Sequence, residues 1–291
     1  MRLAVTGKQG QVVTALRERG PQVGVEIIAV GRPEMDLTDP ASIRRILSEV
    51  KPDAIVSAAA YTAVDKAESE PELAFTVNAR GPAALAEIAA KIDVPVVHLS
   101  TDYVFPGDKD GIYLETDATG PVSVYGTSKL AGEEAIAAAT HNHVILRTAW
   151  VYSPFGANFV KTMLRLAETR NALNVVADQH GTPTSALDIA DAVITIAKRL
   201  VSDPDPELRG VFHLTAQGEA TWADFAEAIF GVLRERKGKA VTVGRITTDQ
   251  YPTPARRPAN SRLSTEKLAK TYGIVLPDWE QSTRVVLDHL L

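Results

Sequence analysis

The chain has 291 residues, of which 45% are apolar and 23% charged, a composition typical of a globular protein with a sizeable core. Its net charge of −5 argues against a nucleic-acid-binding protein, because such proteins need a basic surface to meet the phosphates. Cysteine is absent, which excludes disulfide bonds and thiolate chemistry and suits the reducing cytoplasm.

No targeting or membrane segment is evident in the sequence. The apolar stretch that follows the first residues runs only from Leu3 to Val5, which is shorter than the core of a signal peptide. No apolar run approaches the roughly 18 residues that a membrane-spanning helix needs. We therefore expect a cytoplasmic protein without a membrane anchor.

The first predicted unit is a strand, a glycine turn and a helix. The apolar strand ends at Val5, and Gly7 and Gly10 follow before a helical pattern that runs through Leu16. Gly7 would allow the tight turn, and Gly10 would let backbone amides approach a pyrophosphate at the helix N-terminus. Val13 stands where a third glycine would continue the pattern, so this dinucleotide-binding fingerprint is incomplete.

A second apolar strand, Val25 to Val30, ends at Gly31 and Arg32. In a Rossmann-type sheet this strand end meets the adenosine ribose of a dinucleotide. An acidic residue there would bind the 2′-hydroxyl group of NAD, whereas an arginine accommodates the 2′-phosphate of NADP. Arg32 therefore favours NADPH as the cofactor and leaves NADH open as a second one.

The next elements continue to alternate between helices and strands. Asp39 and Pro40 form a helix start, and residues 54–60 make a continuous apolar strand, as expected when helices cover both faces of a parallel sheet. The segment 71–90 predicts a long alanine-rich helix, in which Asn78 interrupts the apolar pattern. This alternation predicts an α/β fold with a doubly wound parallel sheet.

Polar side chains follow the next buried strand, 94–99, at its carboxyl end. Ser100, Thr101 and Asp102 come directly after this strand. The carboxyl ends of the strands form the edge of an open parallel sheet where ligands bind. We therefore expect these three side chains to face a ligand.

Tyr125 and Lys129 lie four residues apart in a helix that the sequence predicts over 122–139, so their side chains share one face of it. Tyrosine ordinarily has a pKa of about 10, which makes it a reluctant proton donor at neutral pH. A neighbouring ammonium group would stabilise phenolate and lower that pKa toward the working range. The pair therefore predicts a proton-donating tyrosine supported by a lysine.

After the strand 143–148 the alternation of strands and helices loosens. We expect helices over 158–167, 186–200 and 222–234, and strands over 174–177 and 211–214. Two interleaved lobes follow from this pattern: a Rossmann-type domain of residues 1–152 and about 185–214, and a smaller substrate-binding lobe of residues 153–184 and 215–291. Pro204 and Pro206 indicate a turn, so we expect no flexible hinge between the lobes.

Five further stretches of sequence are distinctive: Ala58 to Glu68 (AAAYTAVDKAE), Ser100 to Phe105 (STDYVF), Arg147 to Tyr152 (RTAWVY), Asp178 to Thr184 (DQHGTPT) and Arg256 to Leu263 (RRPANSRL). With the glycine turn and Tyr-x-x-x-Lys, they resemble the extended short-chain dehydrogenase/reductases that act on nucleotide sugars. Within that group they resemble the dTDP-4-dehydrorhamnose reductase family over most of the chain. The resemblance implies a homodimer that reduces the 4-keto group of dTDP-4-dehydro-L-rhamnose to dTDP-L-rhamnose with NADPH.

The resemblance also implies a role for individual residues. Tyr125 would donate a proton to the developing alkoxide, Thr101 would hydrogen-bond the same oxygen, and Lys129 would hold the nicotinamide ribose. Asp102 and Trp150 would contact the sugar, together with Thr101. The cofactor would lie against Gly7, Gly10, Gln11, Val12, Arg32, Asp36, Leu37, Ala60, Tyr61, Thr62, Tyr125 and Lys129.

Three other positions are informative when the chain is compared with the family pattern. Asn78 lies where an asparagine supports the active-site tyrosine in related enzymes. Ser57 stands where the family commonly has an asparagine, which places a local hydrogen bond in doubt. Ala15 falls where some members have a glutamate that carries magnesium at a dimer contact, so we expect no metal.

Other functions of this fold remain open. A nucleotide-sugar dehydratase would need a glutamate directly after Thr-Asp, where this chain has Tyr103, and a 4-epimerase usually has Ser-Ser at that strand end. A catalytically idle regulatory subunit, like that of methionine adenosyltransferase, could keep the fold without Thr101, Tyr125 and Lys129. The joint presence of these three residues favours the reductase.

Overall fold

The computed structural model describes residues 1–291 and is built around one parallel sheet. Its six strands, in order across the sheet, are β10 (Gly210–His213), β5 (His143–Thr148), β4 (Val96–Thr101), β3 (Ala54–Ser57), β1 (Arg2–Thr6) and β2 (Glu26–Val30). Every neighbouring pair runs parallel. The strand order reverses between β1 and β3, which makes the carboxyl ends of these two strands the place where a Rossmann-type sheet binds ligands. The predicted fold class is therefore confirmed.

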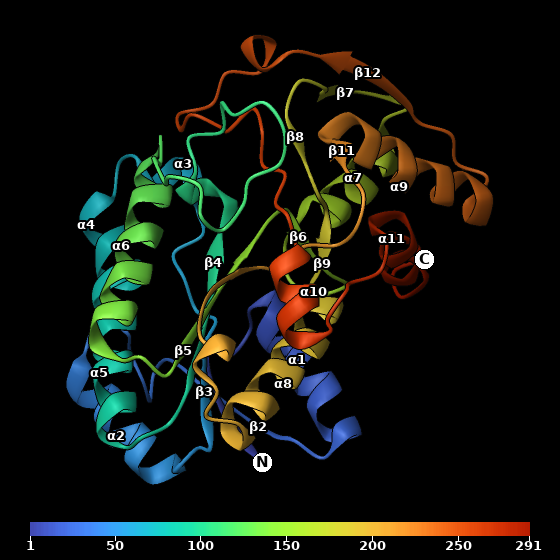
Figure 1. Ribbon diagram of the computed structural model, residues 1–291. Helices are drawn as coiled ribbons and strands as arrows, with labels where there is room; N and C mark the ends of the chain where they lie inside the picture. The colour runs from blue at the N-terminus through green and yellow to red at the C-terminus, as the bar shows by residue number, and fades with distance from the viewer.

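Helices cover both faces of this sheet (Figure 1). On one face lie α1 (Gln11–Arg19) and α8 (Ala186–Ser202); on the other lie α2 (Pro40–Val50), α5 (Gly81–Lys91) and α6 (Val124–Ala139), with the short α3 (Val64–Ala67) and α4 (Pro71–Phe75) nearby. Side chains of β1 alternate between the two cores: Leu3 and Val5 join the cluster that contains α1 and α8, and Ala4 joins the one that contains α2 and α5. The continuous apolar strands are thus explained, because both faces are covered.

The later part of the chain adds a smaller group of elements at the carboxyl edge of the sheet (Figure 1). It contains the helices α7 (Phe159–Thr169), α9 (Trp222–Lys237), α10 (Glu266–Tyr272) and α11 (Trp279–Asp288), and the parallel strands β7 (Ala172–Val176) and β12 (Thr242–Ile246). One short pair, β6 (Val151–Tyr152) with β9 (Thr184–Ser185), joins it to the rest, and a second, β8 (His180–Gly181) with β11 (Ala220–Thr221), lies within it. One hydrophobic cluster includes residues of both β1 and α9, so the two parts share a core.

Local signals explain several of these boundaries. Asp39 caps α2, because its side chain accepts a hydrogen bond of 3.0 Å from the amide of Ala41, and Pro40 occupies the first turn.

Four 3₁₀ turns and one π-helical turn complete the elements: η1 (Gly20–Val23), η3 (Asp102–Val104), η4 (Pro206–Leu208), η5 (Thr248–Gln250) and the π-helical η2 (Thr76–Arg80).

Two sequence-based boundaries are wrong in detail. The strand expected over 54–60 ends at Ser57, because the amides of Ala58 and Ala59 both donate to the hydroxyl of Thr6, at 2.9 Å each, and leave the ladder. The helix expected over 71–90 is divided by η2 before Pro82, which has no amide hydrogen to continue the α-helical ladder.

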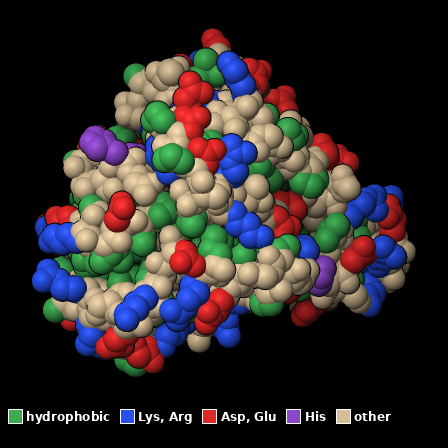
Figure 2. Space-filling model, turned by 60° about the horizontal axis from the view of Figure 1, so that its bottom comes forward, with side chains coloured by type: hydrophobic (Ala, Val, Ile, Leu, Met, Phe, Trp, Pro, Cys, Tyr) green, Lys and Arg blue, Asp and Glu red, His purple; other side chains and the backbone are tan.

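No helix is both long enough and apolar enough to cross a membrane. Figure 2 shows acidic and basic side chains intermingled over one face of the molecule, without a broad area of a single charge. This pattern agrees with the modest net charge of −5.

Candidate active site

The glycine turn after β1 lies beside the segment that follows β3. Gly7 has a φ of +100°, a conformation that favours glycine, and its amide donates to the carbonyl of Val30 at 2.7 Å. A Cβ on Gly7 would lie 3.3 Å from Cγ2 of Val13 and 3.5 Å from Cβ of Ala59. Because Gly7 has no side chain, there is room for the buried Val13. The turn after β1 can also approach the segment after β3 closely at the strand-order reversal.

Gln11 begins α1 but its side chain faces the later part of the chain. Its Oε1 accepts hydrogen bonds from Ser153 at 2.7 Å and from Asn158 at 3.0 Å, and its amide nitrogen donates to the carbonyl of Val151. The side chain is thus fully engaged in the structure. The groups of Gln11 and Val12 that could bind a pyrophosphate are their backbone amides, which lie at the helix N-terminus.

At the end of β2, Arg32 is exposed and makes no hydrogen bond or ion pair. Lys8 of the glycine turn reaches the same place and forms an ion pair with Glu34. Asp36 accepts hydrogen bonds from the amide and the hydroxyl of Thr38, each 2.9 Å, and these bonds lower the pKa of its carboxyl group. Two cations, Lys8 and Arg32, therefore flank the position where the sequence places the adenosine ribose, and only Arg32 was predicted there.

Asn78 joins the segment after β3 to α6. Its Oδ1 accepts from the amide of Tyr61 at 2.8 Å, and its Nδ2 donates to the carbonyl of Tyr61 at 3.1 Å and to the hydroxyl of Ser128 at 3.0 Å. Ser128 in turn donates to the carbonyl of Tyr125 at 2.8 Å. Asn78, which is fully buried, thus fixes a predicted cofactor segment relative to the helix turn that carries Tyr125.

Tyr125 lies in the first turn of α6, which Ser123 caps by accepting from the amide of Gly126 at 3.1 Å. A Cβ on Gly126 would collide with the carbonyl oxygen of Tyr103, so this glycine lets α6 start against η3. The ring of Tyr103 meets the ring of Tyr125 edge-on at 5.4 Å. Burial raises the pKa of Tyr125 and a hydrogen bond with Thr101 partly opposes that effect, so the phenol stays protonated at neutral pH.

Lys129 lies on the same face of α6 but its ammonium group turns toward β4. Nζ donates to the carbonyl of Leu99 at 2.7 Å and lies 3.3 Å from Nε2 of His98. Burial lowers the pKa of Lys129 to about 8, against the opposing charge of Glu133. The sequence predicted that Lys129 lowers the pKa of Tyr125; in this structure burial dominates instead, and the tyrosine pKa moves upward.

Thr101 and Asp102 stand at the end of β4. The Thr101 hydroxyl accepts from the amide of Tyr103 at 3.2 Å and donates to Oδ1 of Asp102 at 2.9 Å. Asp102 is 3% exposed, and its Oδ2 makes no hydrogen bond of good geometry, although the Ser261 hydroxyl lies close enough to lower the pKa of the carboxyl group. Burial raises the pKa of Asp102 to about 6. An acceptor of this kind, buried and unpaired at a sheet edge, suits a hydroxyl group of a ligand.

Trp150 has an unusual backbone, with a φ of +49° in a residue other than glycine. Its ring stacks on Trp222 of α9, with centroids 3.7 Å apart and planes 10° apart. A Cβ on Gly181 would lie 2.6 Å from the Trp150 ring, so this glycine makes the stack possible. Trp222 was not predicted as a site residue, because its partner comes from a distant part of the chain.

Comparison with known proteins places this arrangement in a family. The family model described as "RmlD substrate binding domain" matches residues 1–291. A curated dTDP-4-dehydrorhamnose reductase from Sinorhizobium fredii is 58% identical over 291 residues, covering 100% of this chain and 98% of the relative. The chain belongs to the dTDP-4-dehydrorhamnose reductase family.

Solved structures of the family agree with this assignment. A dTDP-4-dehydrorhamnose reductase from Clostridium acetobutylicum superposes with a TM-score of 0.93 at 37% identity, covering 100% of this chain and 99% of that one. The Bacillus anthracis enzyme, solved in complex with NADP, has a TM-score of 0.92 at 32% identity, covering 99% of this chain and 98% of that one. The fold and the family inferred from the sequence motifs are both confirmed.

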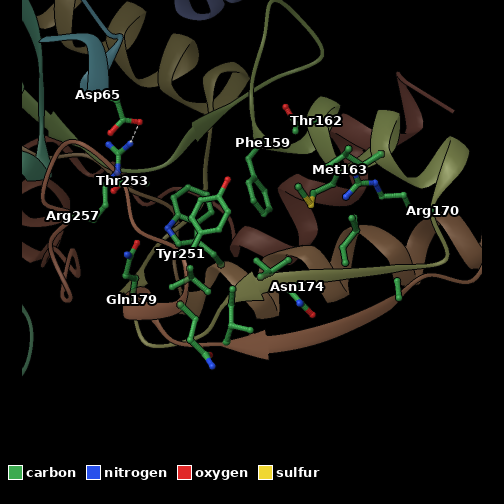
Figure 3. Close-up of a pocket in the computed structure, with 18 of the residues that line it drawn as sticks. Asp65, Phe159, Thr162, Met163, Arg170, Asn174, Gln179, Tyr251, Thr253 and Arg257 are labelled. Carbon is green, nitrogen blue, oxygen red and sulfur yellow. Dashed lines mark hydrogen bonds and ion pairs between the residues drawn. The ribbon is translucent and has the colours of Figure 1, made fainter. Parts of the chain in front are cut away.

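A cavity opens beside the tyrosine site, among the later elements of the chain. It has a volume of about 1010 Å³ and contains residues of α7, β7, β12 and α9, together with Asp65 and Tyr103 beside the tyrosine site. In Figure 3, Asp65 and Arg257 face each other at one end, Met163 and Arg170 lie at the other, and Tyr251 stands between. None of these residues was predicted as a site residue, although Asp65 lies in the distinctive stretch Ala58 to Glu68 and Arg257 in the stretch Arg256 to Leu263, which we call the Arg-Pro segment.

Arg257 connects this cavity to the tyrosine site. Its Nη2 pairs with Oδ2 of Asp65 at 2.6 Å, and its Nη1 donates to the hydroxyl of Tyr103 at 3.3 Å. Asp65 also accepts from the amide of Ala255 at 3.2 Å, which ties the Arg-Pro segment to the sheet domain. The cavity therefore has a cation without an ion-pair partner at one end, Arg170, and the Arg257–Asp65 ion pair at the other.

Proposed function

We propose that this chain is an NADPH-dependent dTDP-4-dehydrorhamnose reductase that converts dTDP-4-dehydro-L-rhamnose to dTDP-L-rhamnose. The observation that carries the proposal is the position of Tyr125. Its phenol stands beside Thr101 at the carboxyl end of β4, and its ring meets the ring of Tyr103, which lines the cavity of about 1010 Å³. Relatives that carry this enzyme name span the whole chain.

The residues fit a dinucleotide. A Cβ on Gly31 would lie 3.4 Å from Cα of Gly7, so the turns after β1 and β2 pack closely together with no side chain between them. We propose that Gly7, Gly10, Gln11 and Val12 hold the pyrophosphate through backbone amides. Arg32, Asp36 and Leu37 would bind the adenosine, and Ala60, Tyr61, Thr62, Tyr125 and Lys129 the nicotinamide half.

When bound, NADPH would supply a hydride to the C4 carbon of the sugar ketone. Tyr125 would donate its hydroxyl proton to the oxygen on which negative charge develops. Thr101 would hydrogen-bond the same oxygen. Lys129 would bind the ribose hydroxyls, and Asp102 would accept from a sugar hydroxyl through its unpaired Oδ2.

We propose that the diphosphate and nucleoside of the substrate extend from the tyrosine site into the cavity. Arg170 gives the cavity positive charge at one end, Arg257 offers guanidinium donors beside Asp65 at the other, and Tyr251 offers an aromatic face between them. Trp150 and Trp222 would border the sugar.

We also propose a cytoplasmic homodimer, as the resemblance implies, and keep the division into residues 1–152 with about 185–214 and residues 153–184 with 215–291. In support of the division, β10 pairs with β5 at the edge of the sheet and α8 packs beside α1.

The test is an assay of the purified chain with NADPH and dTDP-4-dehydro-L-rhamnose. We expect one NADPH oxidised for each dTDP-L-rhamnose formed, with the product identified by NMR. Oxidation of NADPH without that product would indicate a different sugar reductase. Interconversion of UDP-glucose and UDP-galactose would indicate an epimerase, and no turnover of either substrate would contradict an enzymatic role.

A further inference from the structure

A fully buried histidine lies beneath the helix that carries the tyrosine and the lysine. His98 on β4 is 0% exposed, and its ring stands between Ser57 of β3 and Lys129 of α6. Its Nδ1 is 3.0 Å from the hydroxyl of Ser57, and its Nε2 is 3.3 Å from Nζ of Lys129. The reaction proposed above gives neither His98 nor Ser57 any part, although both contact or support a residue of the site.

The hydrogen bonds fix the tautomer of this histidine. A charged Lys129 has only donors, so Nε2 of His98 must accept and Nδ1 must carry the ring proton, which it donates to Ser57. Burial, followed by the charge of Lys129, lowers the pKa of His98 well below its ordinary value, so the ring is neutral. The ammonium group thus has two acceptors, the ring and the carbonyl of Leu99.

The two acceptors of Lys129 differ in what they can do. The carbonyl of Leu99 can only accept, whereas a neutral imidazole can accept or donate at Nε2, depending on its tautomer. When Lys129 loses its proton, His98 can donate from Nε2 to the free amine, provided that Ser57 then donates to Nδ1. A serine hydroxyl both donates and accepts, so the Ser57–His98 pair can support the lysine in either state.

The other charged or titratable groups near Lys129 either have other hydrogen-bond partners or stay protonated. Glu133 on α6 is held by Arg147, at 2.7 Å, and by the hydroxyl of Ser100. Tyr125 stays protonated, and His143 on β5 hydrogen-bonds the carbonyl of Thr140 at 2.7 Å. Of the groups around it, only His98 contacts the amine through a side chain. The charges that act on the pair come from Glu133 on α6, which faces Lys129, and from His143 on β5, which faces His98.

We propose that His98, oriented by Ser57, is a positioning residue that holds the Lys129 amine in place in both of its protonation states by exchanging tautomers. This inference rests on the proposed role of Lys129. It also gives a reason for the serine at position 57, where the family commonly has an asparagine: here the hydroxyl completes the support of the buried ring.

The first experiment observes the tautomer and needs no activity. Two-bond ¹⁵N–¹H spectra of the ¹⁵N-histidine-labelled full chain at pH 7 should show one histidine with its proton on Nδ1 that is absent from the His98→Gln spectrum. Raising the pH through about 8, where Lys129 titrates, should move that proton toward Nε2. A His98 signal with the proton on Nε2 at pH 7, or one that does not change with pH, would overturn the proposal.

The second experiment measures the pH profile of kcat/KM in the NADPH oxidation assay. His98→Leu removes the acceptor, so kcat should fall roughly 10- to 100-fold and the alkaline limb should move down by about one pH unit. In His98→Gln the amide oxygen can accept from Lys129, so most of the kcat and most of the position of the alkaline limb should be restored. Ser57→Ala should shift the limb in the same direction by less.

His213→Asn is the matched control, because His213 is a 0% exposed histidine of the edge strand β10, two strands from β4, and bonds the carbonyl of Ser264, away from Lys129. We expect it to lower stability without moving the pH profile. If the wild type is active but His98→Leu and Ser57→Ala keep its profile, the inference fails while the proposed function stands. If the wild type is inactive with every sugar, the proposed function fails and the tautomer spectra still decide the inference.

Discussion

Arg257 and Asp65 form an ion pair, with Nη2 and Oδ2 2.6 Å apart, although they are separated by most of the chain. The pair joins the Arg-Pro segment to α3 beside the cavity, and Nη1 of the guanidinium donates to the hydroxyl of Tyr103, whose ring meets the ring of Tyr125 edge-on. Arg257 thus holds the proposed nucleotide-sugar cavity in a fixed position relative to Tyr125, the proposed proton donor.

We therefore expect Arg257→Ala to raise KM for the nucleotide sugar roughly tenfold or more, because it removes a charge-assisted contact at the cavity mouth. The affinity for NADPH, measured by fluorescence titration, should stay within about twofold. Arg256→Ala is the matched control, since Arg256 is the exposed neighbour and makes no ion pair. Equal effects of the two substitutions on KM would show that Arg257 has no special part in substrate binding.

Arg32→Ala should weaken NADPH binding more than NADH binding. Only the phosphorylated cofactor offers a 2′-phosphate for the bidentate contact that an arginine makes, and the Arg32 side chain is exposed and unpaired. Calorimetric titration with each cofactor measures both affinities. Arg44→Ala, an exposed arginine of α2, should change neither; equal losses for both cofactors in Arg32→Ala would contradict the assignment.

Much of the sheet domain could be predicted because its signals are local. Glycine turns, the Asp39 cap and continuous apolar strands each report a structure formed within a few residues. The strand over 54–60 was too long for a non-local reason, since the Thr6 hydroxyl, far away in sequence, takes the amides of Ala58 and Ala59.

The later elements could not be predicted in the same way. The strand β12 has one neighbour, β7, and that pairing joins segments about 70 residues apart, as the partners Thr242 and Ala172 show. The cavity is built on this pairing, so its residues carry no pattern of their own. The orientation of the Lys129 amine was missed because helical spacing places side chains on a face without deciding which acceptor they reach.

Val13 is expected to contribute burial without displacing α1 from the glycine turn. It is 2% exposed, and its Cγ2 occupies the space that the missing side chain of Gly7 leaves open. We predict that Val13→Gly lowers the free energy of unfolding by about 2.5–4 kcal/mol, from about 1.5–3 for lost burial and about 1 for glycine in a helix. NADPH affinity should not increase.

Arg17→Gly is the control for that substitution, because it places glycine at an exposed position of the same helix and should cost only about 1 kcal/mol. Urea denaturation and cofactor titration of the two variants provide the comparison. A Val13→Gly protein that binds NADPH several-fold more tightly at unchanged stability would show that the valine had pushed the helix outward.

Asp102→Asn should stabilise the ligand-free protein at pH 8 while impairing its activity. Burial raises the pKa of Asp102 from 3.8 to about 6, so its folded state favours the protonated form. The stabilising contribution of that form is complete below about pH 4 and is lost as the pH rises through about 6. Above pH 6 the wild type therefore carries a buried carboxylate that the amide avoids.

The shift in the Asp102 pKa corresponds to at most about 3 kcal/mol, at about 1.4 kcal/mol for each pKa unit. Urea denaturation at pH 8 and pH 4 should show a stability gain for Asp102→Asn that shrinks toward zero at the lower pH. A gain that is independent of pH would contradict the assigned titration, and unchanged KM for the sugar would remove Asp102 from the substrate site.

The central claim is that Tyr125 donates the proton to the reduced ketone. The most direct test is the single-turnover rate of NADPH oxidation by Tyr125→Phe with saturating dTDP-4-dehydro-L-rhamnose, beside the wild type. We expect the rate to fall by about 10² or more, because the donor hydroxyl is lost, while the affinity for NADPH stays nearly unchanged. A rate within about threefold of the wild type would contradict the claim.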